Sequence, residues 1–535
     1  MRDFTHPWEV DEPAAAPVEP PKHNGEVALP EITVTAGERH KAADDGIAAL
    51  HAAGVAFYQR DRMLVRVCDI KARSTSGDVI LVPGIANVTP AILERALGQV
   101  ARWQRFDAKK EHMLRIDPPR LVISQILDMV GEWPFPPLIG VIGCPTLRHD
   151  GSLLADEGYD PATGLVLKAA VAMPPIPAGP TRRDAEDAVA LLADLLVEFP
   201  FANDASKAVA LSMLLTPVLR GAMAAAPMHL VTAPQPGSGK SYMADTASMI
   251  ATGERIAAVA VAPKPEETEK RLIGSALAGL PVIGLDNCRD TLEGDFLCQV
   301  TERPLLQLRP LGTSDKIRVA NTFTTFANGN NVAVADDLVR RTICCELDAN
   351  VENPECRTFK GDPLAAVHRA RGSYVSACLS IALAYIAAGK PNRLPPLPSY
   401  EGWSDTVRSP LVWLGFTDPV ETMATARAVD PVRQARARVF EAWRGELGQE
   451  AHTASEIIEL AEGRYSYDGS LVRPNLHAAL IEVAEKRARP ANQLDARRLG
   501  KWLTKQENTI AGQLKLTIDR SDRQRPRYSV RSLLR

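Results

Sequence analysis

The middle of the chain switches between two spacings of apolar residues. Apolar positions recur every three or four residues over 182–198 and 205–223, which predicts two amphipathic helices. From 228 to 347, short apolar runs alternate with helical patterns, and that order predicts a parallel sheet covered by helices. Helical spacing returns over 366–388 and, in shorter pieces, over 403–428.

The segment before this core has a mixed pattern of apolar residues. It is typical of an α+β domain, and it includes two predicted short strands around a turn over 150–167. The other expected elements are helices over 45–58 and 122–133 and strands over 63–67 and 138–143. Proline-rich stretches at 173–180 and 390–398 predict linkers before and after the core.

The C-terminal segment, from about Val432, ends in a basic helix and a basic hairpin. A helix is predicted over 495–506, and two strands over 513–519 and 527–530. A helix followed by a basic hairpin is the layout of a winged helix, which binds duplex DNA. The alternative is a solvated basic tail. The candidate DNA contacts are Arg497, Lys501, Lys505, Arg523 and Arg525.

Charge is distributed unevenly along the chain. The whole chain carries 62 Lys and Arg against 65 Asp and Glu, a net charge of −3, which by itself predicts no polyanionic partner. Residues 1–40 hold six prolines and eight acidic against three basic residues, as expected for a disordered tail. Residues 491–535 hold 11 Lys and Arg against 4 acidic residues, so the neutral average conceals a basic end.

Cysteine usage and hydropathy predict a cytoplasmic protein. The eight cysteines form no CxxC pair, so a zinc site is not expected, and their scatter fits a reducing compartment. The first ten residues, MRDFTHPWEV, lack the apolar segment of a signal peptide. The longest apolar helical run, about 377–388, is too short to cross a bilayer, which takes roughly 20 residues.

The strongest chemical signal follows the strand that begins at Met228. The strand leads into a glycine-containing loop, and GSGKS then opens a helix. Glycines let backbone N–H groups curl around phosphate oxygens, and the helix N-terminus adds partial positive charge. In such a loop the lysine reaches the β- and γ-phosphates and the serine hydroxyl ligates Mg²⁺. The candidate ATP-binding residues are Pro236, Gly237, Ser238, Gly239, Lys240 and Ser241.

A second apolar strand, within 277–287, supplies an acid for the magnesium. Asp286 stands at its end, where a carboxylate can hold the metal's water shell; a helix cap is the alternative role. The next residue is Asn287, and an amide cannot take a proton from water. A catalytic base is therefore sought in the cluster Glu266, Glu267 and Glu269, with Glu267 or Glu269 favoured, although acids also suit a solvated helix start.

Further candidates lie between residues 305 and 347. The last strand there is predicted over 321–327, and Asn330 beyond its tip is the preferred contact for the γ-phosphate or the attacking water. Asn328 and Asn331 are alternatives. The turn 312–316 is expected to project as a hairpin carrying Lys316. Arg340 and Arg341 precede a further strand and are candidates for an arginine finger, or else for a surface pair answering Asp336 and Asp337.

The order of these motifs carries a family resemblance. GSGKS is followed by TEKRL, a strand with Asp-Asn, a hairpin, GNN and Asp-x-x-Arg-Arg. In this order residues 184–431 resemble the superfamily 3 helicase/AAA+ ATPase modules of phage, prophage and plasmid primase-helicases. Pro234 and Asn287 depart from the common motif, and no primase signature precedes residue 184.

The resemblance implies roles for individual residues. Lys240, Ser241 and Asp286 would bind ATP and Mg²⁺, and Asn330 would be the sensor asparagine. Arg340 or Arg341 would be the finger, reaching the nucleotide of a neighbouring subunit in a hexameric ring. Lys316 would line the central channel and grip single-stranded DNA.

The combined expectation is a multidomain α/β protein that acts as an ATP-dependent DNA helicase or replication ATPase of a mobile element. Two rivals stay open: an ATP-switched DNA-binding loader or scaffold with weak hydrolysis, and a P-loop regulator of a host-defence or mobile-element system without unwinding. The expected parts are a disordered acidic tail (1–40), an N-terminal α+β accessory domain (41–180), a P-loop NTPase (AAA+-like) domain with a parallel-sheet core and a helical lead-in (181–390), a helical lid or linker (391–431) and a C-terminal winged helix (432–535).

Overall fold

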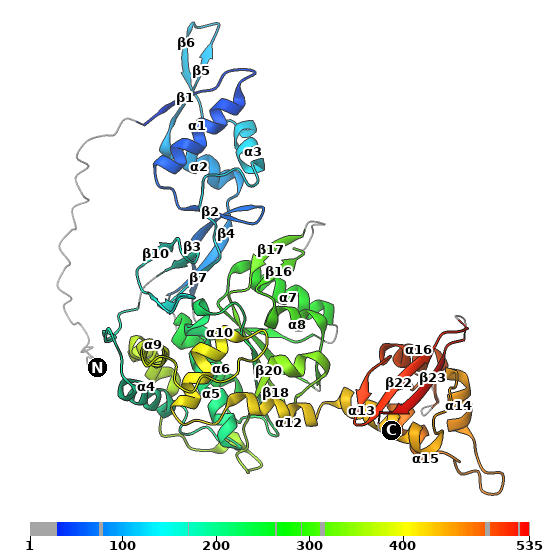
Figure 1. Ribbon diagram of the computed structural model, residues 1–535. Helices are drawn as coiled ribbons and strands as arrows, with labels where there is room; N and C mark the ends of the chain where they lie inside the picture. The colour runs from blue at the N-terminus through cyan, green and yellow to red at the C-terminus, as the bar shows by residue number, and fades with distance from the viewer. Residues whose placement is uncertain are drawn as a thin grey trace, which may run out of the picture. The chain divides into compact units, whose positions relative to one another are not determined.

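The computed structural model gives the chain as two compact units (Figure 1). One unit combines the described residues up to 56 with residues 88–135, and the other combines 57–87 with the chain from 136 onward. The segment predicted as one accessory domain, 41–180, therefore contributes to both units. The structure describes residues 29–73, 79–168, 171–262, 265–289, 291–310, 316–486, 493–522 and 525–533.

The first unit packs three helices beside a small sheet. Strand β1 pairs in parallel with β5, and β5 pairs with β6. The helices enclose Trp103, which is 2% exposed and donates its indole N–H to the carbonyl of Leu97 at 3.2 Å. The elements are β1 (Glu31–Thr33), α1 (Arg39–Ala52), α2 (Pro90–Val100), β5 (Arg102–Asp107), β6 (His112–Arg115) and α3 (Arg120–Asp128).

Three sequence expectations need correction here. The tail predicted over 1–40 is wrong from residue 31, because Ile32 is buried and β1 joins a sheet; residues 1–28 lie outside the described part. The helix expected over 45–58 instead spans Arg39–Ala52, and Phe57 already begins a strand. The helix expected over 122–133 ends at Asp128.

The second unit begins with short antiparallel strands. Strands β2 (Phe57–Arg60), β3 (Met63–Arg73) and β4 (Val79–Asn87) form one sheet. A second sheet has the order β10-β11-β7, and β8 pairs with β9. The strands expected over 63–67 and 138–143 are confirmed within β3 and β7. The remaining bounds are β7 (Gly140–Ile142), β8 (Thr146–Leu147), β9 (Leu153–Leu154), β10 (Gly158–Asp160) and β11 (Leu165–Leu167).

A five-stranded sheet forms the centre of the second unit, in the order β13-β14-β18-β12-β20. All four neighbouring pairs are parallel, so the predicted parallel sheet is confirmed. The carboxyl ends of parallel strands meet at one edge, where ligands of such sheets bind. The strands are β12 (Met228–Ala233), β13 (Ala257–Ala260), β14 (Val282–Cys288), β18 (Thr324–Asn330) and β20 (Thr342–Glu346). The final strand expected over 321–327 is thus shifted by three residues.

Helices and smaller elements surround this sheet. A capping box begins α4: Thr181 Oγ1 accepts the Asp184 N–H, and the Asp184 carboxylate accepts the Thr181 N–H. The flanking helices are α4 (Arg182–Asp194), α5 (Asp204–Val218), α6 (Lys240–Thr252), α7 (Pro265–Ala278), α8 (Asp295–Glu302) and α9 (Pro363–Ala387). Shorter elements are η1 (Arg220–Ala222), β15 (Thr291–Leu292), β16 (Leu305–Leu308), β17 (Ile317–Ala320), β19 (Ala333–Val334), η2 (Asp336–Arg341) and η3 (Pro354–Cys356).

The region expected as a lid packs into the same core. Trp403 is 0% exposed and donates its indole N–H to Thr216 Oγ1 of α5 at 3.1 Å. The helical pieces expected over 403–428 are confirmed as α10 (Glu401–Trp403), η4 (Ser404–Arg408), α11 (Ser409–Trp413), η5 (Pro419–Glu421) and α12 (Thr422–Ala428). Among the described helices, only α9 is long and apolar enough to cross a membrane, and 67% of its most apolar window is buried inside the protein.

The C-terminal segment forms a core of its own. Leu499 and Leu503 are buried against Phe440, Trp443 and neighbouring apolar residues. A β-bridge joins His452 to Tyr528 of the hairpin, so a short extended segment before α14 borders the hairpin. The elements are α13 (Pro431–Glu446), α14 (Ala454–Glu462), α15 (Pro474–Ala484), α16 (Ala496–Lys505), β21 (Ile510–Ala511), β22 (Leu514–Asp519) and β23 (Arg527–Ser532).

Candidate functional site

The loop between β12 and α6 has the backbone geometry of a phosphate cradle. Gly237 has φ +74° and Gly239 has φ +92°, conformations that L side chains rarely adopt. A Cβ on Gly237 would stand 2.9 Å from Cβ of Glu355, and one on Gly239 would stand 3.1 Å from the ring of Phe199. Gly239 caps α6, so the positive end of this helix faces the loop. A side chain at either glycine would be strained and would crowd Glu355 or Phe199, so both positions require glycine.

Lys240 and Ser241 open α6 beside this cradle. Lys240 is 9% exposed, and its ammonium group donates to the carbonyl of Gln235 at 3.1 Å. Burial lowers the pKa of Lys240 from its ordinary value. The hydroxyl of Ser241 donates to Oδ1 of Asp286 at 3.3 Å. The two oxygens suited to a magnesium ion and its water shell therefore lie together, although they come from residues 45 apart in the chain.

A local irregularity in β14 shapes the opposite wall. The pairing of β14 with β18 shifts register between Leu285 and Cys288, and Asn287 has φ +54°. The backbone N–H of Asn287 donates to the side-chain oxygen of Asn328 at 3.3 Å. Asn328 is 7% exposed, whereas Asn330 ends its strand exposed to the cleft.

These residues line one open cleft of about 500 Å³. The cleft brings together the whole GSGKS loop, Asp286 and Asn287, and both candidate asparagines of β18; Asn331, the third candidate, does not line it. The residues are Pro236, Gly237, Ser238, Gly239, Lys240, Ser241, Tyr242, Asp286, Asn287, Asn328, Gly329 and Asn330.

The candidate glutamates lie outside this lining. No glutamate is among the described residues that line the cleft, although the carboxylate of Glu355 lies beside Gly237 of the loop. Glu267 is exposed in the first turn of α7 and pairs with Lys270 at 2.6 Å, and this interaction lowers the pKa of Glu267. Glu266 is exposed and Glu269 half-buried. A catalytic role for one of them stays a prediction.

The two candidate finger arginines have different surroundings. The side chain of Arg341 is 6% exposed, and its guanidinium donates to Glu302 through Nε at 2.8 Å and to the Asp337 carbonyl at 2.7 Å. The side chain of Arg340 is 45% exposed and pairs with Asp337 at 2.6 Å. Burial opposes ionisation of Glu302, but hydrogen bonds from Ser399 and Arg341 lower its pKa overall. Arg341 is held as a structural ion pair, and Arg340 is the arginine able to reach outward.

A second pocket, of about 370 Å³, adjoins the phosphate loop and was not predicted from the sequence. It shares Gly237, Ser238, Gly239 and Tyr242 with the cleft, and the rings of Phe199 and Phe359 line it. The guanidinium of Arg357 lies 5.2 Å from the centre of the Phe359 ring. No spacing in the sequence marked these aromatic residues, because they come from two loops about 160 residues apart.

Two further contacts secure the walls of this pocket. The Glu198 carboxylate accepts the backbone N–H groups of Lys360 and Gly361, both at 2.8 Å, and these bonds lower the pKa of Glu198. Tyr242 donates its hydroxyl to Asp362, which caps α9. Burial and this hydrogen bond raise the pKa of Tyr242 to about 12. The helix of the phosphate loop is thereby joined to α9.

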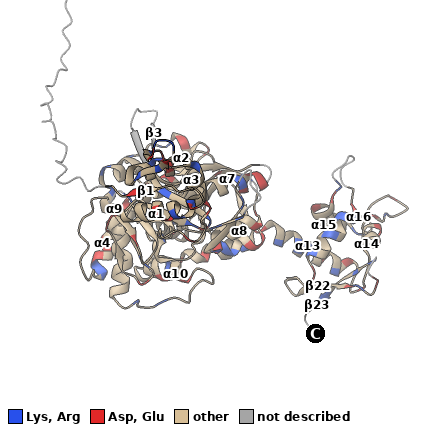
Figure 2. Ribbon diagram, turned by 90° about the horizontal axis from the view of Figure 1, so that it is seen from above, with Lys and Arg blue, Asp and Glu red and all other residues tan. Residues whose placement is uncertain are grey.

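The candidate DNA contacts lie on exposed positions. Strands β16 and β17 pair as the expected hairpin, and Lys316 is exposed at its turn end, directly before β17; the turn residues 311–315 lie outside the described part. Arg497, Lys501 and Lys505 are exposed on α16, and Figure 2 shows basic positions on α13 and beside α16. Arg525 is exposed beyond β22, and Arg523 lies outside the described residues.

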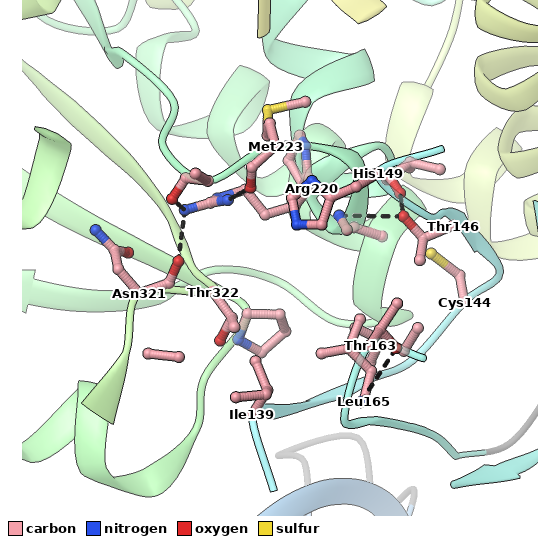
Figure 3. Close-up of a pocket in the computed structure, with 18 of the residues that line it drawn as sticks. Ile139, Cys144, Thr146, His149, Thr163, Leu165, Arg220, Met223, Asn321 and Thr322 are labelled. Carbon is pink, nitrogen blue, oxygen red and sulfur yellow. Dashed lines mark hydrogen bonds between the residues drawn. The ribbon is translucent and has the colours of Figure 1, made fainter. Parts of the chain in front are cut away.

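A third cavity, of about 290 Å³, lies near Arg220 (Figure 3). The guanidinium of Arg220 donates to the carbonyls of Asn321 at 2.6 Å and Phe323 at 3.1 Å, and to Met223 and Ala224. Burial lowers the pKa of Arg220 to about 10. The arginine ties η1 to the start of β18, which is a structural role.

Comparison with known proteins gives weak similarities. No protein-family model and no curated protein matches the chain. Two structures of the NrS-1 C-terminal region match 87% and 82% of this chain and 95% and 99% of their own, at 11% and 10% identity and TM-scores of 0.33 and 0.34. The Cch protein of SCCmec type IV, described as an active helicase, matches over 78% of this chain and 85% of its own, at 13% identity and a TM-score of 0.31. TM-scores this low do not establish a shared fold, so function has to be argued from the residues of the chain.

Proposed function

We propose that this protein is an ATP-dependent DNA helicase or replication ATPase of the superfamily 3/AAA+ type, of the kind carried by mobile elements. The observation that carries the proposal is the cleft in which Lys240, Ser241 and Asp286 meet at the carboxyl edge of the parallel sheet. The motif order supports the type of ATPase, and the basic C-terminal helix and hairpin support DNA as the partner.

The geometry of the loop suits a nucleoside triphosphate. The backbone N–H groups of 237–241 and the start of α6 would hold the phosphate chain, with Lys240 exchanging its bond to the Gln235 carbonyl for a phosphate oxygen. Ser241 would ligate Mg²⁺ and Asp286 would hold its water shell; the ion neutralises phosphate charge during transfer. The base would enter the adjoining pocket, where Phe359 offers a ring for stacking.

Hydrolysis needs groups around the γ-phosphate. Asn330, exposed at the end of β18, would orient the attacking water or contact the phosphate. Arg340 would complete the site of a neighbouring subunit by stabilising charge in the transition state. In a ring of subunits, most simply a hexamer, the β16–β17 hairpins with Lys316 would then face DNA in the channel.

A second candidate function is an ATP-switched DNA-binding loader or scaffold with little hydrolysis. Asn287 favours it, because an amide stands after Asp286 and the described cleft lining holds no glutamate. The two candidates share ATP binding and differ in turnover. Steady-state ATPase rates with and without DNA separate them: a DNA-stimulated rate supports the helicase, and a rate near zero with intact ATP binding supports the scaffold.

Equilibrium binding of ATP and of inorganic triphosphate, with Mg²⁺, tests the nucleotide site. Lys240→Ala should weaken binding of both ligands by about a hundredfold, since charge-assisted bonds to phosphate are lost. Phe359→Ala should weaken ATP alone, because triphosphate has no base. Lys41→Ala, on an exposed lysine of α1, serves as the control. Unchanged ATP affinity in Lys240→Ala would refute the assignment.

A further inference from the structure

The β2–β3 turn contacts two parts of the ATPase core at once. Strands β2 and β3 pair up to Arg60 and Met63, which leaves Asp61 and Arg62 as the turn, and Asp61 has φ +53°. The turn reaches the C-terminal end of α7 through Arg60 and the strand β17 through Asp61. Met63, the first residue after the turn, packs against the core cluster that includes Leu306, Ile317 and Val319 of the β16–β17 hairpin.

Arg60 caps α7. Its side chain is buried, at 4% exposed, and it donates to the carbonyls of Leu277 at 2.6 Å and Ala276 at 3.0 Å. These carbonyls belong to the last turn of α7. Carbonyl groups in that turn have no hydrogen-bond donors within the helix and carry partial negative charge. Beside this cap, Ile85 of β4 lies where a Cβ on Gly279 would come within 2.7 Å. The small antiparallel sheet is therefore anchored on α7.

Asp61 holds the hairpin strand. Its carboxylate accepts the backbone N–H of Arg318 at 2.9 Å and lies 3.5 Å from that residue's guanidinium. The side chain of Asp61 is 11% exposed, and that of Arg318 is 66% exposed. Arg318 lies two residues after Lys316, the proposed DNA contact, and both are exposed.

We propose that the β2–β3 turn is a positioning element for the DNA hairpin, with Asp61 fixing β17 and Arg60 fixing the turn on α7. This inference rests on the proposed function, since it takes the β16–β17 hairpin to be a DNA contact. Helix α7 follows β13, whose Ala260 pairs in register with Asp286 of the cleft. The turn thus joins the hairpin to the helix that leaves the nucleotide edge, and it gives residues 57–87 a role in coupling.

The test measures ATP hydrolysis by the full chain as single-stranded DNA is added. Asp61→Ala should leave the DNA-free rate within twofold of the unmodified protein. It should raise the DNA concentration for half-maximal stimulation by about fivefold, since one charge-assisted bond orders the hairpin. Asp61→Asn, which keeps a neutral acceptor for the Arg318 N–H but loses the charge, should fall between Asp61→Ala and the unmodified protein. Arg62→Ala, in the same turn but exposed, is the matched control and should behave as the unmodified protein.

Several outcomes would overturn the inference. If the unmodified protein is stimulated by DNA and Asp61→Ala responds identically, the turn does not position the hairpin. If Asp61→Ala lowers the DNA-free rate and the thermal midpoint together, the residue is only structural. A protein whose ATPase ignores DNA altogether contradicts the proposed function itself, which distinguishes the two failures.

Discussion

Substitution of the two neighbouring arginines at the end of η2 should affect different properties, stability for Arg341 and ATP hydrolysis for Arg340. Arg341→Ala removes a guanidinium that is 6% exposed and leaves Glu302, itself 19% exposed, with a weaker partner in Arg340 at 3.6 Å. Removing one partner of a buried ion pair costs about 3–5 kcal/mol of stability. Because Glu302 keeps its hydrogen bond from Ser399, we expect a cost of about 3 kcal/mol. Arg340→Ala breaks a half-exposed pair worth less than about 1 kcal/mol.

Thermal unfolding measures the difference in stability between the two variants. At about 2–4 °C per kcal/mol for a large unit, Arg341→Ala should lower the midpoint by roughly 6–12 °C and Arg340→Ala by no more than a few degrees. ATPase assays measure the difference in activity, because loss of an arginine finger lowers kcat by about a thousandfold or more. Arg340→Ala should therefore fold normally and hydrolyse ATP poorly.

Mixed assemblies decide whether Arg340 acts across an interface. Arg340→Ala subunits keep an intact phosphate loop, and Lys240→Ala subunits keep an intact arginine. Mixing two inactive preparations should restore part of the activity, because some interfaces then combine both intact halves. An Arg341→Ala protein that is as stable as the unmodified protein but inactive would refute the assignment of these two roles. An inactive mixture would refute the action of Arg340 in trans.

Three more predictions concern other parts of the chain. Asn330→Ala should lower kcat at least about tenfold without changing stability. Asn328→Ala should instead lower the free energy of unfolding in urea by about 1 kcal/mol, because the Asn287 N–H loses its acceptor. Equal effects of the two substitutions on kcat and on stability would contradict this division of roles. Burial lowers the pKa of His229 to about 3, so between about pH 6.5 and pH 3 the unfolded chain binds a proton that the folded chain does not. In that window stability should fall by up to about 1.4 kcal/mol per pH unit as the pH is lowered. His229→Gln should flatten this slope in urea titrations at pH 7 and 5. Lys501→Ala should reduce the slope of log binding constant against log salt for duplex DNA by about 0.9, and an unchanged slope would remove this residue from the DNA surface.

The loop that follows β12 and the acid that meets it could be predicted from the sequence because their signals are local. A loop with glycines, Lys240 and Ser241 must follow a strand, and Asp286 must end another, so the carboxyl edge of a parallel sheet brings them together. The order of strands could not be read, because β18 pairs with β12 across about 100 residues. Two other features could not be predicted because their residues are far apart in the sequence. They are the pairing of Arg341 with Glu302 and the aromatic pocket beside the loop.

Other predictions were wrong where the local composition gave no sign that a residue would be buried. Proline and acid content predicts a tail through residue 40, yet Ile32 is buried and the three-residue strand β1 pairs with β5. The predicted end of β18 was three residues early, because Asn328 resembles a loop residue although its side chain is buried against Asn287. Arg60 gave no signal at all, since its contact with α7 spans 217 residues.

Helicase activity is tested most directly by strand displacement, measured for the full chain with ATP, Mg²⁺ and a forked duplex beside the Lys240→Ala variant. We expect DNA to stimulate ATP hydrolysis, the strands to separate only with hydrolysable ATP, and both activities to disappear in Lys240→Ala. Unwinding that survives in Lys240→Ala would contradict this expectation, and so would an unmodified protein that binds ATP but never separates the strands.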